Sequence, residues 1–113
     1  MKRDPMLFIE DVLESIKNIE EFISGFNKEK FLKSKLRQSA VIRQLEVIGE
    51  AVKNIPESFR NENPRVPWKE IAGFRDVLSH AYFGVDIERV WNIVEIDLPV
   101  LKKDMNLIIG KEN

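Results

Sequence analysis

Residues 75–82 hold the side chains of this sequence that are best suited to chemistry on a phosphodiester. Arg75 offers a planar fork of hydrogen-bond donors for a phosphate, and His80, the only histidine, can exchange a proton near neutral pH. Asp76 lies four positions before His80, so in a helix its carboxylate stacks on the imidazole and could fix the ring's tautomer and raise its proton affinity. These residue types favour general acid–base catalysis at a bound phosphate.

A helix must position these residues, and the apolar spacing predicts one from Trp68 to about Ala81. On a helical wheel the core face holds Ile71, Phe74, Val77, Leu78 and Ala81. The opposite face carries Arg75, Ser79 and His80, together with the small residues Ala72 and Gly73. Because Arg75 and His80 are five positions apart, they lie about 140° from each other on the wheel. The arginine must therefore reach across small neighbours for both groups to meet one phosphate.

Structural roles remain open for the same residues. A lone histidine near a helix end is also typical of a surface or capping residue, favoured there by the helix dipole. Arg75 and Asp76 could be ordinary surface charge, and Tyr82, beside Phe83, could be an aromatic at the core rim. If the helix continues, Tyr82 lies nearly above Arg75; if it breaks before residues 83 and 84, Tyr82 lies nearer His80.

The rest of the chain predicts an all-α fold, an up-and-down bundle of four to five helices. The first helix is expected from Pro5, after an Asp4 cap, to about Ser24. Another is expected from Ser34 or Lys35 to Asn54, with a short turn around Phe31 before it. The proline-containing connection 55–67 has room for one helical turn around Ser58. The expected inner positions are Phe8 or Ile9, Val12, Leu13, Ile16, Ile19 and Ile23 in the first helix, and Val41, Leu45, Ile48 and Val52 in the next.

The last predicted helix follows residues 83 and 84 and begins after an Asp86 cap. Its inner positions are Ile87, Val90, Trp91, Val94 and Leu98. Pro99 must kink or restart this helix, because proline lacks a backbone donor and crowds the preceding turn. The apolar positions then continue through Leu101, Met105 and Ile108.

A polar stripe lies on the outer side of the predicted helix 35–54. It consists of Ser39, Arg43, Glu46 and Glu50. One interpretation is a solvated face with helix-spaced ion pairs, and the other is a charged seam against a partner.

Composition sets the protein class. The 113 residues form one expected domain, 1–113, with 18 basic and 19 acidic residues and a net charge of −1. The absence of cysteine excludes disulfides and thiolate metal sites, and a zinc site would need carboxylates for all ligands but one. No cofactor and no metal is therefore expected. The near-neutral charge argues against broad nonspecific nucleic-acid binding but allows a compact site that touches one or two phosphates. Without a signal peptide or an apolar span, the sequence predicts a cytoplasmic protein away from membranes.

The stretch 73–86, GFRDVLSHAYFGVD, resembles the signature of the HepT-like HEPN toxins. In that family an arginine, an Asn or Asp, three further residues and a histidine are followed by one residue and a tyrosine. Flanking segments are also similar to the family: residues 48–51 with Arg43 upstream, residues 66–68, residues 90–91 and residues 97–99. The likeness covers nearly the whole chain.

The resemblance implies a HEPN helical bundle that forms a homodimer, with two copies of the motif at the interface, and leaves a higher assembly open. It implies a metal-independent endoribonuclease that cleaves tRNA or mRNA, the toxin subunit of a type VII-like toxin–antitoxin pair. Arg75 and His80 would be catalytic, with Asp76 and Ser79 in support. The partner would be a nucleotidyltransferase antitoxin that silences the nuclease by attaching AMP to Tyr82.

Two other functions stay open at this stage. One is a noncatalytic subunit that presents a nucleotide or substrate to a minimal nucleotidyltransferase. The other is a structural dimer whose motif is residual.

Overall fold

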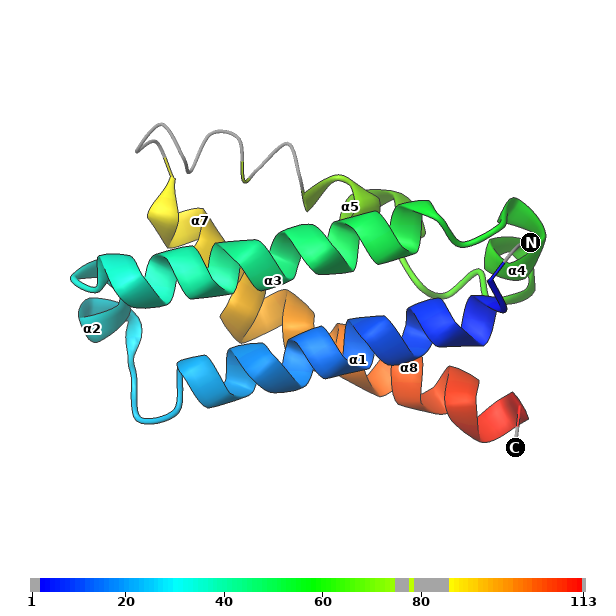
Figure 1. Ribbon diagram of the computed structural model, residues 1–113, viewed down its shortest axis with the longest axis horizontal. Helices are drawn as coiled ribbons and strands as arrows, with labels where there is room; N and C mark the ends of the chain where they lie inside the picture. The colour runs from blue at the N-terminus through cyan, green and yellow to red at the C-terminus, as the bar shows by residue number, and fades with distance from the viewer. Residues whose placement is uncertain (1–2, 75–77, 79–85, 113) are drawn as a thin grey trace.

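The computed structural model describes residues 3–74, 78 and 86–112, and within these ranges the secondary structure is entirely helical. Three long segments build the bundle: α1 (Pro5–Phe22), α3 (Lys35–Lys53), and a continuous run of α7 (Ile87–Asn92), the π-helical η1 (Ile93–Asp97) and α8 (Leu98–Glu112). Helices α1 and α3 run antiparallel side by side, and α8 crosses them diagonally (Figure 1). The predicted all-α fold is confirmed.

Helix α1 begins as the sequence predicts. The Asp4 carboxylate accepts a hydrogen bond from the Met6 N–H at 2.9 Å, and Pro5 occupies the first turn. Of the two residues that could begin the inner stripe, Ile9 is buried and Phe8 only partly buried. The helix ends at Phe22, shortly before Gly25, whose φ of 77° favours glycine.

Helix α3 is fixed at both ends by side chains. The Ser34 hydroxyl accepts from the Arg37 N–H at 3.2 Å and starts the helix. Beyond its other end, the Arg60 guanidinium donates to the carbonyl oxygens of Val52 at 2.6 Å and Ile55 at 3.1 Å. The Val52 carbonyl also accepts from the Ile55 N–H at 3.1 Å, so the guanidinium adds a second donor there and supplies one to the Ile55 carbonyl just past the helix end. All four predicted inner residues of α3 are buried: Val41, Leu45, Ile48 and Val52.

Three short helices connect the long ones: α2 (Lys28–Leu32), α4 (Glu57–Glu62) and α5 (Trp68–Ala72). The first two are the predicted turns around Phe31 and Ser58. Helix α2 begins at an Asn27 cap, whose side chain accepts from the Lys30 N–H at 2.9 Å.

The prediction of one unbroken helix from Trp68 to about Ala81 is wrong at Gly73. Helix α5 ends at Ala72, and helical structure resumes at Phe74 after a turn at Gly73. A β carbon on Gly73 would lie 3.3 Å from the carbonyl oxygens of Lys69 and Glu70, which is a close approach. The turn therefore suits a residue without a side chain.

The last helix passes Pro99 through a π turn. The N–H of Leu98 donates to the carbonyl of Ile93, one residue farther back than in an α-helix. Because Pro99 has no N–H and its ring crowds the preceding turn, the wider π turn relieves a contact that an α-helix would strain. The expected disruption at Pro99 thus takes the form of a local widening rather than a break.

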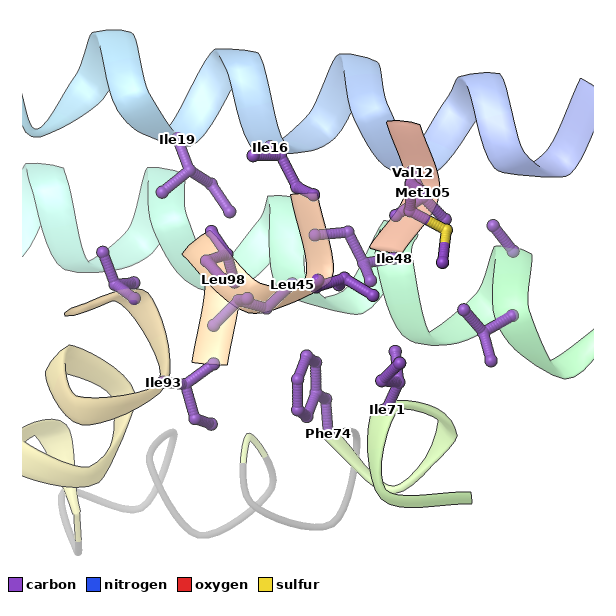
Figure 2. Close-up of a cluster of buried hydrophobic side chains, with 14 of the residues drawn as sticks. Val12, Ile16, Ile19, Leu45, Ile48, Ile71, Phe74, Ile93, Leu98 and Met105 are labelled. Carbon is purple, nitrogen blue, oxygen red and sulfur yellow. The ribbon is translucent and has the colours of Figure 1, made fainter. Parts of the chain in front are cut away.

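Side chains from all the long helices and from α5 meet in one core (Figure 2). Phe74 and Ile71 close this core on the side of α5, opposite the side chains that α1 contributes (Figure 2). Leu78 is also buried in it. None of the described helices combines the length and the hydropathy needed to cross a bilayer.

Candidate functional site

The five residues that the sequence assigns to the site lie outside the described residues. They are Arg75, Asp76, Ser79, His80 and Tyr82. The structure does describe residues before, within and after this stretch, namely Gly73, Phe74, Leu78 and Asp86. These positions, and the elements that contact them, define the surroundings in which the motif must work.

The predicted core face of the helical wheel is confirmed at the three positions that the structure describes. Ile71, Phe74 and Leu78 follow one another at spacings of three and four, and all are buried in the core. Val77 and Ala81, predicted for the same side, lie outside the described residues. The placement of Arg75 and His80 on the opposite face of the helical wheel remains a prediction. It starts from the three core positions that the structure confirms.

The segment after the motif begins at a capped helix. The Asp86 carboxylate accepts from the Arg89 N–H at 3.3 Å, so the predicted cap is confirmed. The break expected at residues 83 and 84 lies outside the described residues. An exposed salt bridge of 3.7 Å links Lys28 Nζ of α2 to the Glu88 carboxylate of α7. The buried Phe31 ring also contacts the Trp91 ring, with centroids 5.1 Å apart.

A groove of about 860 Å³ lies beside the start of the motif. Gly73 and Phe74 line it together with residues of α5 on one side and of the α7–η1–α8 run on the other. Its apolar wall includes two large residues that are strongly exposed, Ile96 at 63% and Val100 at 57%. Spacing by four positions on the outer side of a helix is the signal that could have singled out this pair, and the sequence analysis missed it.

The charges of the groove disfavour a nucleic acid. Among the residues that the structure describes, three carboxylates line it, those of Glu70, Asp97 and Asp104, against one guanidinium, that of Arg89. Asp104 is buried and has no salt bridge or hydrogen bond to any residue that the structure describes. Since these acids would repel phosphates, the groove suits the apolar surface of another protein better than a nucleic acid.

One contact on the outer face of α3 agrees with a solvated face that carries helix-spaced ion pairs. Arg43 is exposed and lies 3.4 Å from the Glu46 carboxylate, three positions along the helix. Both residues line a second hollow, of about 440 Å³, between α3 and the start of α1. There the Arg3 guanidinium contacts the Asp11 carboxylate at 2.7 Å and lies 4.8 Å from the centre of the Phe8 ring. Both arginines of this hollow are thus already paired with acids.

In the ranges that the structure covers, no cluster of three or more His, Cys, Asp or Glu side chains could hold a metal ion. His80 is outside these ranges.

Comparisons with known proteins agree over almost the whole chain. The sequence pattern of the family described as "HepT-like: Ribonuclease HepT-like" matches residues 12–108. The chain is 51% identical to a probable ribonuclease HepT of Thermococcus cleftensis over 102 residues, 90% of this chain and 93% of the relative. It is 49% identical to a candidate RNase of Methanocaldococcus jannaschii over 108 residues, 96% of this chain and 89% of the relative. A candidate RNase of Caldanaerobacter subterraneus is 41% identical over 97% of this chain and 98% of its own length. No solved structure matches the chain.

Proposed function

The chain belongs to the HepT-like ribonuclease family, and on that premise we propose that it is a metal-independent endoribonuclease and the toxin subunit of a toxin–antitoxin pair. The observation that carries this proposal is the conjunction of similarity along nearly the whole chain with a complete Arg75–His80–Tyr82 motif. The cytoplasmic location expected from the sequence belongs to the same proposal.

The chemistry uses the nucleophile that RNA itself contains. His80 removes the proton of a 2′-hydroxyl, the 2′-oxygen attacks the adjacent phosphorus, and the bond from phosphorus to the 5′-oxygen breaks. The leaving 5′-oxygen takes up a proton, and the other product carries a 2′,3′-cyclic phosphate. Arg75 stabilises the charge that builds on the phosphate oxygens in the transition state. No step requires a metal ion.

A homodimer fits both the reaction and the exposed apolar surface. One histidine cannot easily serve both proton transfers, and a twofold pair provides a second copy. We propose that the second copy covers the groove beside the motif, where it would bury Ile96 and Val100. A twofold pairing would run the two α7–η1–α8 segments antiparallel and bring Arg89 of one copy toward Asp104 of the other. Because the groove residue Phe74 directly precedes Arg75, this pairing lies next to the motif.

The proposed antitoxin is a nucleotidyltransferase that transfers AMP from ATP to the Tyr82 hydroxyl and releases pyrophosphate. The adduct would add bulk and negative charge where the RNA phosphate must bind, so it would silence the nuclease. After coexpression with a nucleotidyltransferase encoded beside the toxin, mass spectrometry of the digested chain should place one or more AMP groups on Tyr82. With Tyr82→Phe the adduct should disappear. Adducts that map only to other residues would remove Tyr82 from this role.

The direct test of the proposed function is cleavage of RNA by the purified chain in excess EDTA. We expect cleavage that EDTA does not slow, with products that end in a cyclic phosphate. Cleavage that stops with EDTA and returns with a divalent ion would overturn metal independence. If no RNA is cut in the absence of any partner, but the chain binds a nucleotidyltransferase in a nucleotide-dependent manner, it is a noncatalytic subunit instead.

A further inference from the structure

The ten residues 28–37 concentrate positive charge in an otherwise acidic chain. They contain five of the 18 basic residues and a single acid, Glu29, whereas the whole chain has a net charge of −1. These residues form α2, the connection after it and the first turn of α3. We call them the basic corner, defined by Lys28, Lys30, Lys33, Lys35 and Arg37.

Most of this charge is available to a ligand. All four lysines are exposed. Lys28 and Lys33 have salt bridges of 3.7 and 3.4 Å to carboxylates, and both bridges are open to water, where such pairs stabilise little. Lys30 and Lys35 form no salt bridge to any residue within the described ranges.

The corner also presents a fixed guanidinium and apolar surface. The Arg37 guanidinium lies over the Phe26 ring, 4.8 Å from its centre, so its position is set by an aromatic contact. Leu36, beside it in the chain, is 77% exposed. Guanidinium planes are surfaces on which unpaired bases stack, and the exposed leucine adds apolar contact area beside this one.

The placement of these cations opposes the stability of α3. The N-terminus of a helix carries partial positive charge and favours acidic residues in its first turn. Helix α3 has no acid there, and Lys35 and Arg37 occupy that turn. Arg37 gains its contact with the Phe26 ring, whereas Lys35 breaks the local stability rule without a salt bridge to a described residue, and for such a residue a functional cause is the expected explanation.

The corner contacts α7, the helix that follows the motif segment in the chain. Lys28 pairs with Glu88 in the first turn of α7, and Phe31 packs on Trp91 of the same helix. Helix α7 begins five residues after Tyr82 in the chain. The groove lined by Gly73 and Phe74 carries mainly acids among its described residues, whereas the corner that contacts α7 is basic.

We propose that the basic corner binds the phosphate backbone of single-stranded RNA as it extends from the motif. The proposal rests on the ribonuclease function and adds a docking surface to it. The lysines neutralise successive phosphates, and Arg37 with Leu36 supports a base. A chain with nearly balanced charge thereby binds RNA along one path instead of over its whole surface.

The test measures binding and cleavage separately. Binding uses a 2′-O-methyl RNA of about 12 nucleotides, which has no free 2′-hydroxyl and cannot be cut. The variant is Lys30→Glu with Lys35→Glu, which breaks no described salt bridge. The matched control is Lys17→Glu with Lys103→Glu, two exposed lysines of α1 and α8 that likewise form no salt bridge to a described residue.

We expect the corner variant to bind the oligomer at least about tenfold more weakly, with a log–log salt slope shallower by about 1.4 for two lost phosphate contacts. The control variant should bind within about twofold of the wild type, since nonspecific attraction is screened at physiological salt. The thermal midpoint of the corner variant should change little, because glutamate at position 35 suits the start of α3 while glutamate at position 30 opposes the end of α2. Equal affinities for both variants, or equal losses, would overturn the proposal.

Two further measurements, of RNA cleavage and of binding to lipid vesicles, separate this proposal from the proposed function and from a role at a membrane. The corner variant should cut a dinucleotide as the wild type does and show a raised KM for the long RNA. If the wild type cuts no RNA, the proposed function fails while the binding result still decides the role of the corner. If the variant loses binding to vesicles of anionic lipid but keeps its RNA affinity, the corner serves a membrane surface and the RNA assignment is overturned.

Discussion

Replacing His80 with alanine should lower the rate of RNA cleavage by about 10²–10⁴-fold, because the chain has no other histidine to transfer the proton. Arg75→Ala should lower the rate by about 10²–10³-fold through loss of charge stabilisation in the transition state. Asp76→Asn should keep partial activity, since Asp76 only orients the imidazole. Single-turnover cleavage of a labelled RNA measures all three, and overexpression of the His80 or Arg75 variant should no longer arrest growth.

The control for these variants is Arg65→Ala, at an exposed arginine in the connection before α5. It should cleave at the wild-type rate. Light scattering and thermal melts should show the same oligomeric state and the same midpoint for all variants, because we expect these side chains on the polar face of the helix, where substitutions change stability by only tenths of a kcal/mol. A His80→Ala chain that cleaves as fast as the wild type would contradict its catalytic role. Equal losses for Asp76→Asn and His80→Ala would mean that Asp76 acts directly on the substrate.

The second large effect concerns stability. Phe31 has no exposed surface and joins α2 to α7 through its contact with the Trp91 ring. Phe31→Ala should therefore lower the free energy of unfolding by about 3–5 kcal/mol. Natural domains are stable by only about 5–15 kcal/mol, so this one change removes a large part of the total. Urea titrations followed by circular dichroism measure the loss, and the thermal midpoint should drop by more than about 10 °C.

Leu36→Ala is the matched control, because it deletes a large apolar side chain from the same corner at a site that is 77% exposed. It should change the free energy of unfolding by less than about 0.5 kcal/mol. A loss below about 1 kcal/mol for Phe31→Ala would show that α2 contributes little to the bundle, and the contact with α7 would then not hold the basic corner in place.

Helix ends were predictable from the sequence where a single side chain determines them. Asp4, Asp86 and Ser34 each cap a helix as their residue types suggest. The interruption at Gly73 was not predictable from periodicity. Ile71, Phe74 and Leu78 keep helical spacing across it, and all three stay in the core. A single turn of this kind leaves the apolar pattern unchanged, so only the backbone reveals it.

Only part of the candidate site and its surroundings was predictable from the sequence. The residue types of the motif can be read directly from the sequence. The burial of Phe74 and Leu78 within it follows from their helical spacing. The groove does not, because its walls come from α5 and from the α7–η1–α8 run, which meet only in the folded chain. The charge of residues 28–37 is visible in the sequence, whereas their closeness to α7 depends on the contacts of Lys28 and Phe31.

The two tryptophans of the chain stand on either side of the motif in sequence, in different surroundings. The indole N–H of Trp68 donates to the Asn63 carbonyl at 2.9 Å, whereas that of Trp91 is buried and has no acceptor among the described residues. The chain thus carries an intrinsic fluorophore on each side of the motif in sequence, and Trp68→Phe would isolate Trp91, which packs on Phe31 of α2. Its emission would then report on this corner of the fold without any attached dye.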